Sequence, residues 1–307
     1  MPEHGWDDDM TFKPLPCRDR WLGLLAILGL IALDVWIVSR ILARPVDGWS
    51  FLLGMGVLAS LLVNAYIAYR TLGAFTLEYW IDRDAVTLVW GPTRQIVPIA
   101  CIERILVNTG SRPVRSIRPW HWPCRDRRRV AGAGLGVVNA YATRPLAEQV
   151  ILVTSEERFG LSPADHEAFL AALQTRYALG VGRPLRAELR RPPLWTWSLW
   201  RDWAAMFLIG AGLLGLLVMF GVLCVRFPGL SLDLPLHFDV NGIPDRIAPK
   251  AGLFALPVIG LLAWGLNLVI GVWMYRRVQQ QGAYLVWGGA LGVQLIAGLA
   301  LFNLMRW

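Results

Sequence analysis

Five long apolar runs with almost no charge dominate the pattern of hydrophobic and polar positions. These runs are Trp21–Ala43, Phe51–Tyr69, Trp203–Val225, Gly252–Tyr275 and Ala283–Met305. A helix of about 20 apolar residues crosses the roughly 30 Å hydrocarbon core of a bilayer. The pattern therefore predicts five transmembrane helices, arranged as a hairpin of two near the start of the chain and a group of three near its end.

The segment between the second and third runs has a different period. Short apolar stretches bounded by turn residues predict strands, which we place at 75–81, 86–90, 95–98, 102–107, 149–154 and 158–161. Ser162 and Pro163 then suit the N-cap and the first position of a helix. The apolar face of this helix, which ends at Gly180, is formed by Phe169, Leu170, Leu173 and Tyr177. Short strands followed by one amphipathic helix predict a small half-open barrel.

These patterns together predict a membrane all-α bundle of about five transmembrane helices with an inserted small β-barrel-plus-helix domain. We expect a cytoplasmic N-terminal tail, a transmembrane hairpin, the inserted domain, a basic and Trp-rich interfacial linker, and a three-helix transmembrane domain. Their expected bounds are 1–20, 21–72, 73–180, 181–202 and 203–307, with an outside loop at 227–250.

Composition agrees with a membrane protein, and the basic residues suggest its orientation. The chain is 55% hydrophobic and 17% charged, whereas soluble domains are roughly 25% charged. Its net charge is +8, and most of its Arg residues lie within 71–201. Further basic residues precede the first run and follow the fourth, namely Lys13, Arg18, Arg20, Arg276 and Arg277.

Basic segments are retained on the cytoplasmic side of a membrane. We therefore expect the N-terminus and residues 73–202 in the cytoplasm, and the 227–250 loop and the C-terminus outside, in the plasma (inner) membrane of a cell. Arg40 and Arg44 would then lie outside, which is the one conflict with this rule.

Arginine and tryptophan are interleaved in one part of the inserted domain, within what reads as a long loop at Gly110–Gly136. The residues are Arg112, Arg115, Arg118, Trp120, Trp122, Arg125, Arg127, Arg128 and Arg129. A polybasic patch near an anionic membrane surface gains about 1 kcal/mol per cation. These side chains are candidates for contact with membrane lipids or a protein partner, and a solvated loop that only enforces orientation explains them equally. We expect no nucleic-acid partner, because the loop is tethered beside a bilayer.

The loop between the third and fourth runs carries the most distinctive string of residues. Its motif positions are Pro235, His237, Phe238, Gly242, Pro244, Asp245 and Lys250. His237 is the side chain expected to titrate near neutral pH. The loop is either a recognition or sensing element, or a tight turn whose polar residues tie two helices together. We expect no metal here, because His237, Asp239 and Asp245 do not form a closed ligand set.

Asp34 lies inside the first run. A charged side chain at this depth normally faces the interior of a helix bundle. We expect it either to pair with Arg40, six residues on, or to hydrogen-bond an interhelical partner such as Asn64. A proton or ion path would rest on this single acid.

Two parts of the chain resemble known families. The strand, turn, strand and Leu161–Asp165 sequence that lead into Phe169 resemble the end of bacterial pleckstrin-homology-like (PH-like) domains, over Gly73–Leu179. The Pro-x-His-Phe and Gly-x-Pro-Asp strings with the following Lys250 are similar to the membrane domain at the start of Sdp-type immunity proteins, over Arg201–Arg277. The second resemblance implies a membrane protein that protects against, or senses, an envelope-active agent.

The sequence contains no HExxH, GxSxG, Walker or CxxC motif. We therefore expect no enzyme and no cofactor. The sequence predicts a membrane scaffold or binding protein whose basic domain docks lipid or a protein partner, including service as an accessory subunit of a membrane complex. The alternative is an envelope-stress sensor or immunity-like protein that acts through the 235–250 loop.

Overall fold

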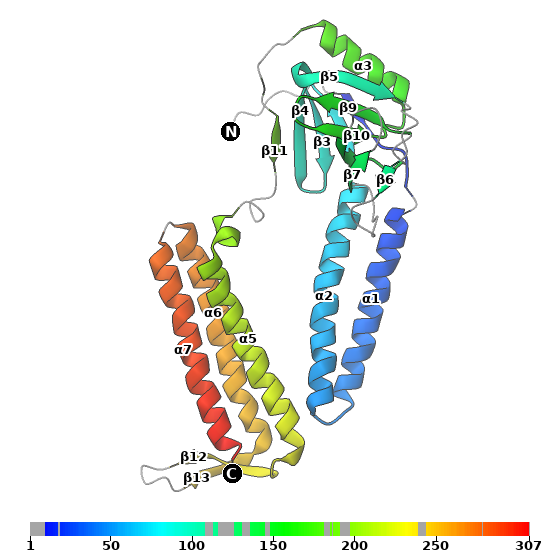
Figure 1. The fold of residues 1–307 in the computed structure, drawn as a ribbon. Coiled ribbons are helices and arrows are strands. Elements are labelled where there is room, and N and C mark those ends of the chain that lie inside the picture. Colours follow the sequence, from blue (N-terminus) through cyan, green and yellow to red (C-terminus); the bar gives the residue numbers. More distant parts are fainter. Residues whose placement is uncertain are drawn as a thin grey trace. The chain divides into compact units, whose positions relative to one another are not determined.

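Five helices in the described part of the chain are long and apolar enough to cross a membrane. The computed structural model describes residues 10–17, 19–107, 113–115, 126–130, 136–144, 148–180, 185, 187–190, 197–238, 244–277 and 279–306. The five helices are α1 (Asp19–Leu42), α2 (Gly48–Phe75), α5 (Trp203–Arg226), α6 (Ala255–Arg276) and α7 (Gln280–Leu304) (Figure 1). Each predicted run overlaps one of them, which confirms the membrane part of the predicted fold.

Contacts divide the chain into two compact units. The first unit combines the inserted domain with the adjoining ends of α1 and α2. The second unit combines the remaining parts of these two helices with α5, α6 and α7.

The domain of the first unit is built from two sheets and one helix. One sheet has the order β1 (Met10–Phe12), β2 (Glu78–Ile81), β3 (Ala85–Trp90), β4 (Thr93–Pro98) and β11 (Glu188–Arg190). The other has the order β5 (Ile102–Val107), β9 (Val150–Thr154), β10 (Arg158–Leu161), β8 (Gly136–Tyr141), β7 (Asp126–Val130) and β6 (Pro113–Arg115). Helix α3 (His166–Ala178) follows β10, and β8 and β10 pair in parallel.

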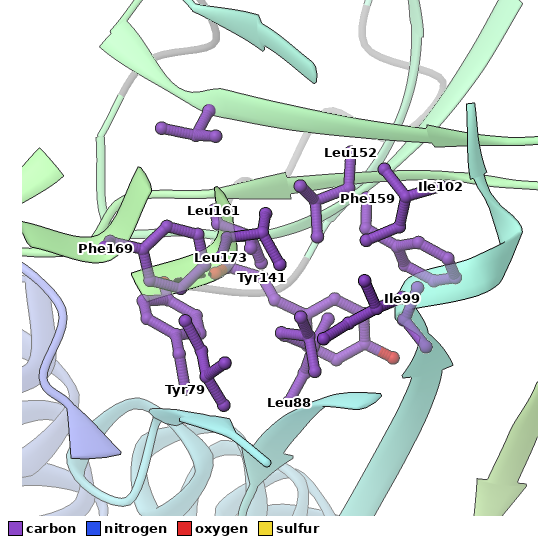
Figure 2. Packing of buried hydrophobic residues seen from close by; sticks show 14 of the residues in the cluster. Tyr79, Leu88, Ile99, Ile102, Tyr141, Leu152, Phe159, Leu161, Phe169 and Leu173 are labelled. Atoms are coloured by element: carbon purple, nitrogen blue, oxygen red, sulfur yellow. Dashed lines mark hydrogen bonds between the residues drawn. The ribbon is translucent and has the colours of Figure 1, made fainter. Parts of the chain in front are cut away.

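One hydrophobic core joins both sheets to α3. Alternate residues of β2 point inward, so that Tyr79 and Ile81 are fully buried. Figure 2 shows Tyr79 beside Phe169 of α3, with ring centroids 6.3 Å apart. The hydroxyl of Tyr79 donates to the Tyr141 carbonyl at 2.6 Å and accepts from the Ser162 N–H at 3.2 Å. The one polar atom of this buried ring is therefore satisfied.

The helix begins later than its sequence suggests. Its N-cap is Asp165, whose side chain accepts from the Ala168 N–H at 2.9 Å, so the predicted cap at Ser162 is wrong. Ser162 is buried and accepts from the Thr143 N–H at 2.8 Å instead. Phe169 is buried as predicted, but Tyr177 is 66% exposed. The apolar face is therefore shorter than the sequence pattern implied.

The sheet also recruits two segments from outside the predicted 73–180 range. Strand β1 comes from the segment predicted as a tail and pairs with β2, with Thr11 opposite Trp80. The N–H of Leu15 donates to the Ser162 carbonyl at 3.1 Å, and the Ala164 N–H donates to the Lys13 carbonyl at 2.9 Å. Strand β11, from the predicted linker, pairs with β4. The chain before α1 and the domain after α2 therefore lie on the same side of this helical hairpin.

A tight contact joins α2 to the domain. Trp90, at the end of β3, is 1% exposed and lies against Gly73 of α2. A Cβ at position 73 would lie 2.2 Å from the Trp90 ring. Tyr69 makes an edge contact with the same indole at 5.2 Å, and the Arg70 guanidinium lies 5.5 Å from its centroid. Gly91, at a φ of 56°, turns the chain beside this contact.

Helices α5, α6 and α7 form a bundle, and Asp202 joins them at the end where α5 begins. This carboxylate caps α5 by accepting from the N–H groups of Ala204 and Ala205, both at 3.1 Å. It also accepts from Tyr275 of α6 at 2.9 Å and from Tyr284 of α7. The Tyr284 hydrogen bond, together with the backbone and Tyr275 bonds, lowers the pKa of Asp202 from its ordinary value. One carboxylate therefore joins three helices.

Asp34 has an interhelical partner of the expected kind. The Ser60 hydroxyl of α2 donates to Asp34 Oδ2 of α1 at 3.0 Å. The Arg40 guanidinium lies over the Trp36 ring, 5.9 Å from its centroid. A neighbouring helix therefore supplies the contact as expected, but through Ser60, which the sequence analysis did not name, rather than through Asn64.

The contact between α2 and Trp90 can be tested by Gly73→Ala. The added methyl group overlaps the indole, so we expect a loss of about 1–3 kcal/mol of stability, the usual range for overpacking. Thermal unfolding of the full chain in detergent, followed by tryptophan fluorescence, measures the effect. Gly54→Ala is the matched control, because nothing lies within 4 Å of a Cβ at this position of the same helix. An equal thermal midpoint for both variants would contradict the packing argument.

The Asp202 tie predicts a pH dependence. Its lowered pKa means that its stabilisation is present above the unfolded value of about 3.9, and is lost as the pH falls through the lower folded value. Asp202→Asn keeps the cap but removes the charge. We expect a lower thermal midpoint at pH 7 and a difference from the wild type that shrinks below about pH 4. Thermal midpoints are measured from pH 7 to pH 3, with the exposed Asp233→Asn as the control. A difference between Asp202→Asn and the wild type that stayed constant over this range would refute the prediction.

Candidate binding sites on the domain and the outer loop

The Arg-rich part of the domain contains two strands that its sequence did not suggest. The range 110–136 was expected to be a loop, but Arg115 lies in β6, and Arg127, Arg128 and Arg129 lie in β7. Strand β7 pairs with β8, with Arg128 opposite Val138. The other candidates of this segment lie outside the described residues, namely Arg112, Arg118, Trp120, Trp122 and Arg125. Backbone pairing of β7 with β8 and of β6 with β7, rather than an apolar period, forms these strands.

The distinctive loop between α5 and α6 is a β-hairpin. Its strands are β12 (Asp233–Phe238) and β13 (Pro244–Pro249), which pair in antiparallel register. Pro235 lies opposite Ile247, and His237 lies opposite Arg246. The backbone of Phe238, Pro244 and Asp245 belongs to the same two strands, and Gly242 lies outside the described residues. Figure 1 shows this hairpin at the end of the three-helix bundle where α5 ends and α6 begins.

Lys250 fastens this hairpin to the bundle. Its Nζ donates to the carbonyls of Phe227 and Leu230, at 3.0 and 3.1 Å, and lies 4.7 Å from the centroid of the Phe227 ring. Leu234 of the hairpin and Leu253 are each 1% exposed and share one apolar cluster. Lys250 therefore caps carbonyl groups at the C-terminal end of α5, where a cation is favourable. Its position in the motif has a structural explanation.

A cleft opens at the end of the domain that carries the C-terminus of α3. It has a volume of about 330 Å³. Its lining comes from the β2–β3 turn, from the short 3₁₀ turn Ile99–Cys101 and from the end of α3, and consists of Arg83, Asp84, Ile99, Ala100, Arg176, Tyr177 and Gly180. Ile99 is buried and Tyr177 is exposed, so the cleft has an apolar floor and an aromatic rim. The sequence analysis did not single out these residues, because they come from three separate segments.

The cleft and the contact with α2 lie at opposite ends of β3. The Trp90 end of β3 contacts α2, and β3 has six residues. At about 3.3 Å per residue, the five steps from Trp90 to Ala85 place the cleft end of the strand roughly 17 Å from that contact. Figure 1 shows β3 and β4 continuing beyond the end of α2, with α3 at the far end of the domain.

The structural role of Lys250 predicts the effect of removing its charge. Lys250→Met keeps much of the aliphatic stem but leaves the Phe227 and Leu230 carbonyls without their donor. We expect a loss of about 1–3 kcal/mol, the range for a hydrogen bond to a charged group or an unsatisfied buried acceptor. Thermal unfolding in detergent measures it, and Lys250→Arg serves as the conservative control. An unchanged midpoint for Lys250→Met would instead favour a pure recognition role for this residue.

Two family models match parts of the chain. Residues 77–177 match a model described as "Bacterial PH domain". Residues 214–261 match a model described as "Domain of unknown function (DUF1648)". No curated protein and no solved structure matches the sequence.

The first match confirms the predicted PH-like resemblance, within nearly the same bounds. The second match includes the motif from Pro235 to Lys250, but its description names no activity, so the Sdp-type immunity resemblance is not confirmed. The five apolar helices and the matched domain agree with each other. The chain is a multi-pass membrane protein with a bacterial PH-like domain.

Proposed function

We propose that this protein is a non-enzymatic membrane scaffold whose PH-like domain docks a protein partner at the cytoplasmic surface of the plasma membrane. The observation that carries the proposal is the cleft of about 330 Å³ at the membrane-distal end of the domain. Service as an accessory subunit of a larger membrane complex is one form of this role.

The position of the cleft favours a ligand from the aqueous phase. Charges in water are screened beyond about 8 Å at physiological ionic strength. The cleft lies roughly 17 Å from the Trp90 end of β3, which contacts α2. Headgroups of the bilayer that holds α1 and α2 are therefore too distant to occupy it.

The chemistry of the cleft favours a protein over an anionic surface. Arg83 and Arg176 are cationic, whereas Asp84 is anionic, so the lining carries both signs. An anionic lipid surface would favour a lining of one sign. Mixed charges around an aromatic residue and an apolar floor are typical of protein interfaces, in which Tyr and Arg are enriched.

The cytoplasmic placement is part of the proposal. The pairing of β1 with β2 supports placing the start of the chain and the domain on the same side of the membrane. The Arg-rich composition of residues 71–201 supports the cytoplasm as that side. With three helices after the domain, the β12–β13 hairpin and the C-terminus would then face outside.

The alternative is an envelope-stress sensor or immunity-like protein that acts through the hairpin. His237 and Asp245 are the residues that would carry this role. If His237→Ala or Asp245→Ala abolished a protective phenotype without changing the amount of protein, the alternative would replace the scaffold proposal.

Tyr177→Ala combined with Arg83→Glu tests the cleft. Both side chains are exposed, so the fold should persist, and we expect at least a tenfold loss of a co-purifying partner. Truncation of a hot-spot residue at the centre of an interface costs about 2 kcal/mol or more of binding free energy. This corresponds to a loss of affinity of more than tenfold. Mild-detergent purification of the full chain from native membranes, with mass spectrometry of co-purifying chains, provides the measurement.

Arg144→Glu is the matched control, because Arg144 is an exposed arginine of the same domain that does not line the cleft. A stoichiometric partner that this control retains and the cleft variant loses would support the proposal. A particle that contains only copies of this chain, or a partner retained equally by both variants, would refute docking at the cleft.

A further inference from the structure

A second cavity lies where the domain meets the helical hairpin. It has a volume of about 240 Å³. The segment before α1, the end of α2 and the start of β2 enclose it, and the lining side chains that matter for its chemistry are Lys13, Cys17, Arg20, Phe75 and Glu78. These residues come together because β1 returns the start of the chain to the sheet beside β2.

The cavity lies at the level of the lipid headgroups. The first apolar span begins at Arg20 and the second ends at Phe75, so both boundaries of the helical hairpin meet at this point. Trp21 and Phe75 are 54% and 42% exposed, and their rings make an edge contact with centroids 5.6 Å apart. Exposed aromatic rings at span ends are typical of the membrane–water interface.

The guanidinium of Arg20 packs against two aromatic rings beside this cavity. The Arg20 guanidinium lies 5.8 Å from the Trp21 centroid and 5.2 Å from that of Phe75. Its Nε is buried, and no hydrogen-bond acceptor for it exists among the described residues. A buried donor without an acceptor is costly. Lys13 adds a second positive charge to the lining of the cavity.

Glu78 adds an acceptor to the lining of the cavity. One of its carboxylate oxygens accepts from the Trp80 indole N–H at 3.1 Å. A carboxylate has about four lone-pair sites, so it can accept further hydrogen bonds. The cavity therefore offers two cations for an anion and, beside them, one acceptor for a hydroxyl or ammonium group.

We infer that this junction cavity binds the headgroup of a glycerophospholipid from the leaflet on the domain's side, with its phosphate against Arg20 and Lys13 and its ammonium or hydroxyl group facing Glu78. A phosphodiester supplies acceptors for the cationic groups of Arg20 and Lys13 that line the cavity, and the acyl chains enter the bilayer beside Trp21 and Phe75. This site is separate from the distal cleft and does not depend on partner docking there.

Lipid retention by the full chain tests the inference. The protein is reconstituted in nanodiscs of phosphatidylglycerol, phosphatidylethanolamine or phosphatidylcholine, extracted gently, and weighed with its bound lipids by native mass spectrometry. We expect Arg20→Gln to lower retention about tenfold, the effect of losing a charge-assisted hydrogen bond. Arg40→Gln is the matched control, since Arg40 also lies over a Trp ring of α1 but near the opposite end of this helix.

Comparison of the three lipid headgroups tests the role of Glu78 as an acceptor. Phosphatidylglycerol and phosphatidylethanolamine carry donors for a carboxylate, whereas the quaternary ammonium of phosphatidylcholine has no N–H. We expect the wild type to retain the first two several-fold better, and Glu78→Ala to lose this preference. Equal retention of all three lipids by the wild type, or equal retention by Arg20→Gln and Arg40→Gln, would overturn the inference.

Cys17 provides a second readout that leaves the cationic residues intact. In a variant with Cys101, Cys124 and Cys224 replaced by Ser, maleimide labelling reports access to the cavity wall. We expect labelling to be several-fold slower in phospholipid nanodiscs than in detergent, and unchanged when inorganic phosphate is added to the detergent sample. A rate that is the same in both media, or that falls equally with free phosphate, would contradict a lipid site.

Discussion

The contact between Gly73 and Trp90 sets the geometry on which the functional surfaces of the domain depend. It places a buried indole directly against a transmembrane helix, where even a methyl group on the helix would not fit. The domain is therefore a rigid continuation of α2 rather than a module on a flexible linker. One end of β3 contacts α2 and the other lies beside the distal cleft. This arrangement separates the junction cavity, for which we propose a lipid, from the distal cleft, for which we propose a protein partner.

The three-helix bundle is held by polar contacts at both of its ends. Lipid chains are as apolar as leucine, so burial alone provides little drive for helices to associate in a bilayer. Close packing supplies part of the stability, since Gly271 and Gly212 leave room for the indoles of Trp287 and Trp264. Asp202 joins all three helices at one end, and Lys250 fastens the hairpin at the other. Both charged residues lie at helix ends near water, so the free-energy cost of desolvating them is small.

Most of the fold could be predicted because its strongest signals are local. A charge-free run of 20 residues identifies a span without knowledge of its neighbours, and β2, β3 and β9 carry their own apolar patterns. Among the strands that the sequence did not suggest, β1 and β7 lack such a pattern and form through pairing with a neighbour. The N-cap was misplaced because Ser162 and Asp165 are both good caps, and tertiary contacts with Thr143 and Leu15 engage Ser162.

Neither candidate cavity could be predicted, since each is assembled from segments far apart in the sequence. Arg20 and Glu78 become neighbours only when β1 pairs with β2. Arg83 and Tyr177 meet only when α3 packs over the sheet ends. The Arg-rich and His-Phe motifs were recognised because their residues are adjacent in the chain. Among the motif residues that the structure describes, Lys250 has a side-chain role, which is to attach the hairpin to the helical bundle.

The position of β1 also has a consequence for how the protein is made. This strand leaves the ribosome first, but its partner β2 is synthesised only after both helices of the hairpin. The sheet therefore cannot be completed until α1 and α2 have entered the membrane with the start of α1 and the end of α2 on the same side. Once β1 is paired, it closes a ring of chain through the bilayer, and neither helix can reverse its direction unless the sheet opens. Completion of the domain thus acts as a lock on the inserted topology.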